Sequence, residues 1–209
     1  PDGKFLAAGL AEWGQGKEIS GGVQIWDAGL GKSLRTIPQE KVTRFVRFSV
    51  DGKMLASSST LQGIKLWEVE SGKLIREFPG RLGDFSPDGL TFASAVSHAS
   101  EPPKIDIYHL SDGSLKKSLK SEKQTDKSYV LRTEFSPNGK LLAVADWDGS
   151  VTIWDVESGE QKNLFTESEG IHALAFSPDG SQLAIGSENK RLVLRKLEDT
   201  AEKSSSGKK

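Results

Sequence analysis

FSPNGKLLAVADWDGSVTIWDVESGEQKNLF, residues 135–165, contains the end of one apolar segment and then three short segments of alternating or apolar residues, and Gly-based turns separate these four segments. The turns are Asn138-Gly139, Asp148-Gly149 and Ser158-Gly159. Runs of this length bounded by turn signals are typical of β-strands joined by hairpins. The stretch therefore predicts an antiparallel meander.

The same pattern recurs along the chain. The position that closes the third strand of each unit recurs at intervals of 41, 41, 46 and 41 residues, at Trp26, Trp67, Tyr108, Trp154 and Arg195. A second landmark, Asp-Gly or Asn-Gly, precedes each of these positions, and four of the five follow Phe-Ser at Phe48, Phe85, Phe135 and Phe176. A period of about 40 to 45 residues with four short strands indicates a propeller blade. The predicted fold class is all-β, a β-propeller of four-stranded antiparallel blades.

The repeated third strand resembles that of the WD-repeat β-propeller family. It reads VQIWD at residues 23–27, IKLWE at 64–68, IDIYH at 105–109 and VTIWD at 151–155, each preceded by a turn like FSPDG. The resemblance covers residues 1–198 and predicts blades at about 1–38, 39–79, 80–120, 121–166 and 167–198. The strands number eighteen, about four and a half blades, so we expect an incomplete ring and an N-terminally truncated fragment. Residues 199–209 are polar and are expected to be a disordered tail.

Three connections depart from the shortest repeat. Residues 11–22 are Gly-rich, carry Trp13 and are expected to form an enlarged loop in the first blade. Pro102-Pro103 is expected in a loop or at an edge, because proline cannot donate to a strand ladder. A polar, Lys-rich connection at residues 120–128 precedes the fourth blade.

Composition excludes several classes of protein. The net charge is −1, so there is no global attraction to nucleic acid or to an anionic membrane. No apolar run approaches the roughly 20 residues that span a bilayer. There is no Cys, which excludes disulfides and thiolate metal sites without choosing a compartment. We expect a soluble protein, with a cytoplasmic location favoured, that binds neither nucleic acid nor membrane.

The motifs that suggest chemistry are better explained as turns. Gly29–Ser33 reads GLGKS, but Trp26 stands where a phosphate loop needs its first Gly, and a strand is expected to follow. Asp146 and Asp148 resemble the start of a calcium loop, but the twelfth position would be Glu157, beyond a whole strand. No pair among His98, His109 and His172 has metal-ligand spacing. The sequence predicts no catalytic residue, no metal and no cofactor, and so no enzyme.

Many members of the resembled family carry a hydrogen-bonded tetrad of His, Asp, Ser or Thr, and the Trp of the third strand. This chain keeps Trp26, Trp67 and Trp154, with Ser59 and Asp148 as further members. The Gly-His dipeptide is absent, and Leu61 stands where the second blade needs Asp. The resemblance therefore implies blades held mainly by apolar packing, with Trp26, Trp67, Tyr108, Trp154 and Asp148 as structural positions.

Four residues outside the repeat positions are candidates for binding a partner. They share one predicted rim of the propeller and are Trp13, His98, Tyr129 and Trp147. Trp and Tyr dominate binding hot spots, but each aromatic could equally cover the neighbouring blade. The lysines at 116, 117, 120, 123 and 127 indicate a solvated edge or a patch for an acidic partner.

Two functions follow from these residues. The first is a non-catalytic scaffold that binds a protein or peptide on the loop-bearing rim. The alternative is a small-molecule-binding or enzymatic propeller that uses the central channel. Self-association through open sheet edges is a further expectation, because unpaired strand edges invite pairing.

Overall fold

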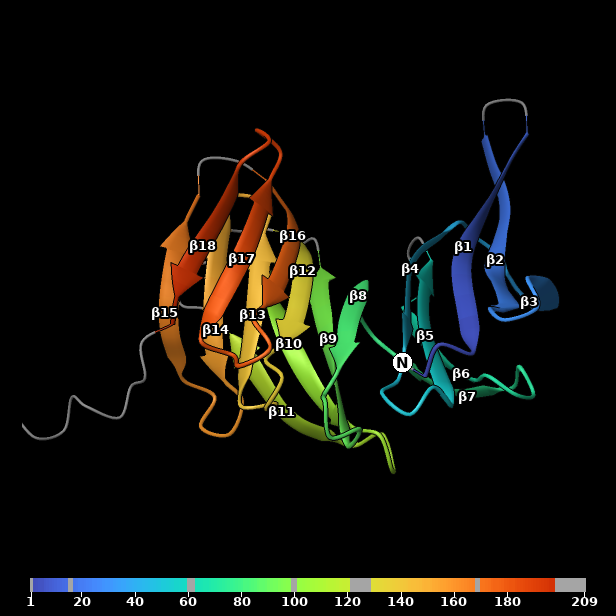
Figure 1. The fold of residues 1–209 in the computed structure, drawn as a ribbon, viewed down its shortest axis with the longest axis horizontal. Coiled ribbons are helices and arrows are strands. Elements are labelled where there is room, and N and C mark those ends of the chain that lie inside the picture. The colour runs from blue at the N-terminus through green and yellow to red at the C-terminus, as the bar shows by residue number, and fades with distance from the viewer. Residues whose placement is uncertain are drawn as a thin grey trace, which may run out of the picture.

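The computed structural model describes residues 2–14, 17–59, 63–98, 101–120, 129–167 and 170–197, and within these ranges the side chains of 12–14, 17–19, 97–98 and 101–103 are left undescribed. The described residues form eighteen strands in five antiparallel sheets and contain no helix (Figure 1). None of them therefore belongs to a helix long and apolar enough to cross a membrane. The all-β fold class is confirmed.

The strands follow one another within each sheet in chain order. The first sheet contains β1 (Phe5–Gly14), β2 (Lys17–Asp27) and β3 (Lys32–Gln39). The second contains β4 (Thr43–Phe48), β5 (Met54–Ser59), β6 (Ile64–Glu68) and β7 (Leu74–Phe78). The third contains β8 (Leu82–Phe85), β9 (Thr91–His98), β10 (Glu101–His109) and β11 (Leu115–Lys120). The fourth contains β12 (Val130–Phe135), β13 (Leu141–Asp146), β14 (Ser150–Asp155) and β15 (Gln161–Thr166), and the fifth β16 (Ile171–Phe176), β17 (Gln182–Ser187) and β18 (Leu192–Lys196).

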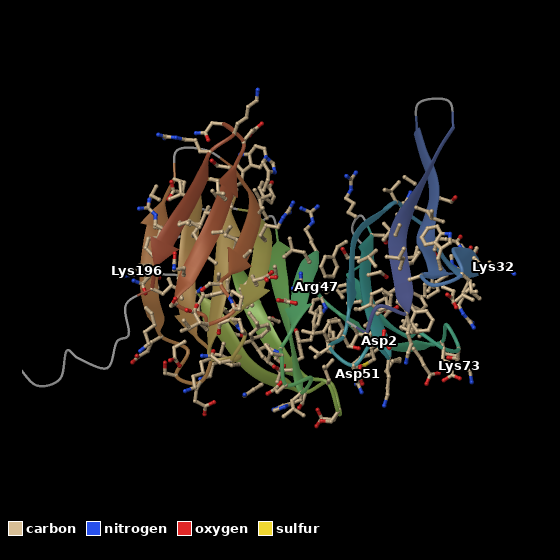
Figure 2. All side chains as sticks on the ribbon, in the orientation of Figure 1. Asp2, Lys32, Arg47, Asp51, Lys73 and Lys196 are labelled. Carbon is tan, nitrogen blue, oxygen red and sulfur yellow. The ribbon has the colours of Figure 1, made fainter. Side chains whose placement is uncertain are left out.

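The inner strands of neighbouring sheets lie next to one another. β1 contacts β4, β4 contacts β8, β8 contacts β12, and β12 contacts β16. In the described part of the chain the five sheets do not close into a ring, as Figure 1 shows. Figure 2 shows Arg47 of β4 in the interior between the second and third sheets, whereas Lys32, Lys73 and Lys196 lie at the outside.

The turns after β4, β8, β12 and β16 follow from the repeated sequence Ser-x-Asp-Gly or Ser-x-Asn-Gly. In the second sheet, Ser49 Oγ donates to Asp51 Oδ1 at 2.7 Å, and the backbone N–H of Lys53 donates to the same oxygen at 3.0 Å. Gly52 has φ of +69°, a conformation that residues with a Cβ adopt rarely. Ser and Asp side chains stabilise such turns by bonding the nearby backbone. The equivalent Ser–Asp or Ser–Asn bonds form at Ser86, Ser136 and Ser177.

Apolar layers between neighbouring sheets form the core. Each of the four buried clusters combines residues of two successive sheets. The aromatic residue of the third strand packs towards the preceding sheet: Trp67 on the first, Tyr108 on the second and Trp154 on the third. In the fifth sheet Arg195 keeps this direction, because its guanidinium lies 5.6 Å from the centre of the Phe165 ring of β15. Trp26, in the first sheet, is half-buried.

The second sheet also contains a buried polar relay. Trp67 Nε1 donates to Ser57 Oγ at 2.8 Å, Gln39 Nε2 donates to the same oxygen, and Thr43 Oγ1 donates to Gln39 Oε1 at 3.3 Å. The resemblance pointed to Ser59 as the partner of the Trp, but Ser57 takes this role. Side chains alternate between the faces of a strand, so Ser57 and Ser59 share a face, and the register that pairs Leu55 with Trp67 brings Ser57 nearer.

Two predicted loops are largely strand. β1 and β2 continue through residues 11–22, so the enlarged loop of the first blade is wrong; the two strands pair as far as Gly14 and Lys17, with a shift at Glu12. Pro102-Pro103 was expected in a loop or at an edge, and it lies within β10, outside the part of this strand that pairs with β11, which begins at Lys104. The register shifts between Glu101 and Lys104, so a bulge accommodates the two residues that lack an N–H. Residues 121–128 and 198–209, which include most of the Lys-rich connection and the predicted tail, lie outside the described residues.

Candidate functional site

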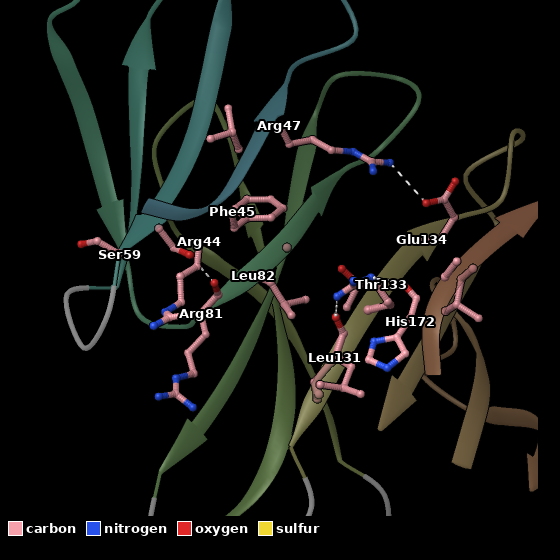
Figure 3. A pocket seen from close by; sticks show the side chains of 17 residues that line it. Arg44, Phe45, Arg47, Ser59, Arg81, Leu82, Leu131, Thr133, Glu134 and His172 are labelled. Carbon is pink, nitrogen blue, oxygen red and sulfur yellow. Dashed lines mark hydrogen bonds and ion pairs between the residues drawn. The ribbon is translucent and has the colours of Figure 1, made fainter. Parts of the chain in front are cut away.

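A cavity of about 930 Å³ lies between the inner strands of four sheets. Its walls come from β4, the end of β5, β8, β12 and β16, so it occupies the position of a propeller's central channel. Figure 3 shows these strands converging on it. The charged and titratable lining residues are Arg44, Arg47, Arg81, Arg132, Glu134 and His172.

The start of each inner strand directs one side chain to the same end of the cavity. In the second, fourth and fifth sheets the pairing skips one residue, and the skipped residues are Arg44, Leu131 and His172. Such a bulge re-aims a side chain out of the ladder. In the third sheet Arg81 holds the same position, four residues before Phe85, as Arg44 does before Phe48. We call these four residues and Arg132 the channel mouth.

Two cations of the channel mouth lack a carboxylate. Arg132 Nε donates to the carbonyl of His172 and Nη1 to that of Leu131, both at 2.6 Å. Carbonyls are neutral, so these bonds fix the guanidinium without cancelling its charge. Arg81 is exposed. Neither arginine forms an ion pair with any residue that the structure describes.

The carboxylates lie deeper in the channel, one residue before the Phe that ends the inner strand of the third and of the fourth sheet. Arg47 Nε lies 2.8 Å from Asp84 Oδ1, and Arg47 Nη2 lies 3.4 Å from Glu134 Oε2. The N–H of Phe135 also donates to Asp84 at 3.0 Å. Burial raises the pKa of Asp84 to about 6, although the Arg47 charge opposes this shift. Figure 3 shows the Arg47–Glu134 pair at one end of the cavity, with Arg44 and Arg81 towards the other.

Of the four predicted binding residues, the structure brings two together beside the channel mouth. Tyr129 precedes β12 and Trp147 lies in the β13–β14 turn, and the Trp147 N–H donates to the Tyr129 carbonyl at 2.8 Å. Their side chains are 53% and 56% exposed. A Cβ built on Gly170 would lie 3.9 Å from both the Trp147 carbonyl oxygen and Leu131 Cδ1. The turn that carries Trp147 therefore adjoins the channel mouth.

The side chains of the other two, Trp13 and His98, lie outside the described residues, so their part in binding stays a prediction. Their backbones lie near the ends of strands, Trp13 opposite Glu18 in β1–β2 and His98 opposite Glu101 in β9–β10. In Figure 1 the β1–β2 hairpin extends well beyond the rest of its sheet, in the same direction as the β17–β18 turn.

The two motifs that resemble a calcium loop and a phosphate loop form turns. Asp148 Oδ1 accepts from the Ser150 N–H at 3.0 Å and from Ser150 Oγ at 2.7 Å. In the GLGKS segment the Gly31 N–H donates to the Asp27 carbonyl at 2.9 Å, and β3 begins at Lys32. Within the described ranges, no three His, Cys, Asp or Glu side chains are grouped to hold a metal ion. Lys116, Lys117 and Lys120 lie on β11, the outermost strand of its sheet.

The sequence interpretation missed the arginines of the channel mouth. The signal was present, because Arg44 and Arg81 both stand four residues before the Phe of the repeated Phe-Ser turn. His172 has the same spacing before Phe176.

Comparison with known proteins agrees with this architecture. The family described as "WD domain, G-beta repeat" matches residues 31–68, 111–155 and 159–194, more than half of the chain. The β-propeller domain of Cps50 (Swd1) from Myceliophteria thermophila has a TM-score of 0.73 at 18% identity, over 97% of this chain and 64% of that one. The chain therefore belongs to the WD40 repeat family, and its fold is a β-propeller fold.

Similar curated proteins are longer than this chain. WD repeat-containing protein SL1-17 of Schistosoma mansoni is 28% identical, over 87% of this chain and 60% of its own length. Actin-interacting protein 1 of Drosophila melanogaster is 24% identical, over 95% of this chain and 32% of its own length. Eukaryotic translation initiation factor 3 subunit I of Scheffersomyces stipitis is 27% identical, over 84% and 53%. Such relatives support a general role in protein interaction.

Proposed function

We propose that this chain is a non-catalytic scaffold that binds a peptide or protein partner on the rim carrying Tyr129 and Trp147. The observation that carries the proposal is the pairing of these two exposed aromatics by a backbone hydrogen bond beside the channel mouth. Large aromatic side chains are enriched in binding hot spots because they bury much area and lose little conformational entropy. Trp13 and His98 are proposed as further members of this surface.

The tertiary structure gives these aromatics a stable platform. Tyr129 leads directly into β12, whose Phe135 belongs to the buried cluster between the third and fourth sheets. Trp147 lies between β13 and β14, which pair in continuous register. A rigid pair of aromatics binds with a smaller entropic penalty than aromatics on a mobile loop, because less freedom is lost on association.

A second candidate is the binding of a small molecule in the central channel, with or without catalysis. The cavity volume favours it, because ligand pockets commonly measure about 300 to 1,000 Å³. Its lining favours binding over proton transfer. Arginine stays protonated in proteins and so cannot act as a general base, and it supplies four of the charged lining residues.

Peptide selection on the chain tests the proposal with no partner chosen in advance. Random dodecapeptides displayed on phage are selected against the immobilised chain, and synthetic copies are measured by fluorescence polarisation. Tyr129→Ala with Trp147→Ala is expected to weaken binding by about tenfold or more, as hot-spot truncations do. The matched control is Leu30→Ala with Leu115→Ala, which removes two other exposed apolar side chains.

Unchanged affinity in the aromatic double variant, or an equal loss in the leucine control, would contradict the rim assignment. A compound that binds the chain saturably, keeps its affinity in the aromatic variant and loses it on substitution of the channel arginines would support the second candidate instead.

A further inference from the structure

The charges of the channel are separated along its axis. Arg44 and Arg81 lie at the channel mouth, whereas Asp84 and Glu134 lie deeper and share Arg47. This order follows from the register of the inner strands, because residues four before and one before the Phe of the turn are three positions apart along a strand. A strand rises about 3.3 Å per residue, so the two levels are about 10 Å apart.

The deeper carboxylates do little to neutralise the mouth. Both are already engaged with Arg47, and they lie about 10 Å from the mouth, which is near the screening length at physiological salt. Among the described residues, Glu188 brings a carboxylate to the mouth, with its Oε2 4.0 Å from His172 Nε2. The guanidinium groups of Arg81 and Arg132 therefore give the mouth a positive potential, although the whole chain has a net charge of −1.

Arg132 is also pre-oriented. Two of its nitrogens are bonded to the carbonyls of His172 and Leu131, so its guanidinium has a defined position while no described carboxylate pairs with its charge. Arginine presents donors in a planar fork that matches a carboxylate. A guanidinium that is already fixed loses less entropy when an anion binds.

We propose that the channel mouth binds an acidic peptide segment, with carboxylates at Arg81 and Arg132 and a neighbouring apolar residue on Tyr129 and Trp147. This inference rests on the proposed function and names the chemistry of the partner. The exposed aromatics beside the mouth favour a peptide over a small anion, which would leave them unused. Nucleic acid is less suitable, because its affinity depends mainly on the number of phosphates that are neutralised, and Arg81 and Arg132 supply two cations.

Hexaglutamate labelled with fluorescein is the first probe, with hexalysine as the charge-reversed control. Binding to the chain is measured by fluorescence polarisation at about 0.1 M and about 1 M salt, where the screening length falls from about 10 Å to about 3 Å. Hexaglutamate is expected to bind at the lower salt and to weaken at the higher one, while hexalysine does not bind. A second probe, hexaglutamate followed by two leucines, is expected to bind more tightly, and to lose that gain in Tyr129→Ala with Trp147→Ala.

Charge reversal locates the site. Arg81→Glu with Arg132→Glu is expected to weaken hexaglutamate binding by roughly tenfold or more, because two attractions become repulsions. The matched control, Lys116→Glu with Lys120→Glu, changes the net charge equally on β11 and is expected to alter binding by less than about twofold. Arg81→Gln with Arg132→Gln provides a neutral variant, and circular dichroism verifies that each variant is folded.

Equal losses in the β11 control, or full binding in the arginine variants, would overturn the proposal. Inorganic triphosphate or single-stranded DNA binding at this site in preference to both acidic peptides would overturn it as well. If acidic probes fail to bind while selected peptides still depend on Tyr129 and Trp147, only the acidic-peptide inference fails. If the selected peptides do not depend on these aromatics, the proposed rim itself is wrong.

Discussion

Trp154 and Trp147 are the same residue type in the same sheet, yet the structure places them in opposite environments. Trp154 lies on β14 within the layer between the third and fourth sheets and is 6% exposed. Trp147 lies in the turn that leads into β14 and is 56% exposed. The interior position recurs in the neighbouring sheets as Trp67 and Tyr108, whereas the equivalent turn of the fifth sheet, residues 188–191, contains no aromatic residue.

The contrast separates two kinds of residue. Residues of the interblade layers are repeated because every blade must bury a face against its neighbour. At the channel mouth the shared position is less uniform, because the four sheets carry Arg44, Arg81, Leu131 and His172 there. Residues repeated in the interblade layers therefore report the fold, and residues outside those layers are better candidates for function.

Truncation of the two tryptophans should show the largest difference. Trp154→Ala is expected to lower the free energy of unfolding by about 3 to 5 kcal/mol, because it removes a buried aromatic side chain and leaves a cavity. Trp147→Ala is expected to change it by less than about 0.5 kcal/mol, as an exposed substitution. Urea denaturation of both variants measures the values. Similar losses in both would refute the contrast.

Asp84 tests the boundary between the buried layer and the channel. Its pKa is raised from 3.8 to about 6 in the folded protein, chiefly by burial, so the folded state binds this proton more tightly than the unfolded state. The resulting stabilisation is present below about pH 3.8 and is lost as the pH rises through about 6. Relative to Asp84→Asn, the wild-type chain should lose about 3 kcal/mol of stability across this window.

Asp51 provides a control, because its contribution to stability is expected to change with pH in the opposite direction. The hydroxyl of Ser49 donates to this exposed carboxylate and lowers its pKa, so its contribution is present above its ordinary pKa and is lost as the pH falls. Asn138 holds the same turn position in the fourth sheet, so Asp51→Asn should preserve the turn. Chemical denaturation at a series of pH values compares the variants. If the stability difference between the wild-type chain and Asp84→Asn does not change with pH, burial of a neutral Asp84 is contradicted.

Ser57 tests whether the layer around Trp67 differs from that around Trp154. Ser57→Ala removes the acceptor of two buried donors, Trp67 Nε1 and Gln39 Nε2, and is expected to cost about 1 to 3 kcal/mol. In the fourth sheet the equivalent position is Val144, two residues after the partner of Trp154. The measurement is thermal unfolding in the wild-type and Trp67→Phe backgrounds. The loss of stability caused by Ser57→Ala should be smaller in the Trp67→Phe background, because the indole donor is then absent. Equal losses in the two backgrounds would argue against the relay.

Local sequence predicted the strands well because each is bounded by a strong turn signal. The strands predicted within residues 135–165 are observed as β13, β14 and β15. The prediction of an enlarged loop at residues 11–22 was wrong for a physical reason. Glycine-rich sequence is read as loop, but strand pairing between β1 and β2 satisfies the backbone and overrides that preference.

Only part of the candidate site could be predicted from the sequence. Tyr129 and Trp147 were identified as aromatics left over from the repeat, eighteen residues apart in the chain. Their direct backbone contact depends on the pairing of β12 with β13, which joins Val130 to Asp146. The sequence interpretation missed Arg132, because its position at the mouth depends on a bulge in β12 that the residue types do not predict.

The sequence by itself determined the repeat, the number of strands and the buried aromatic of each complete blade, because these features are written in local turns and in a period of about 40 residues. The tertiary structure decided which side chains of different blades meet. Arg44, Arg81, Arg132 and His172 come from four sheets and are separated by up to 128 positions in the chain, and only the side-by-side packing of the inner strands, with their bulges, brings their charges to one cavity.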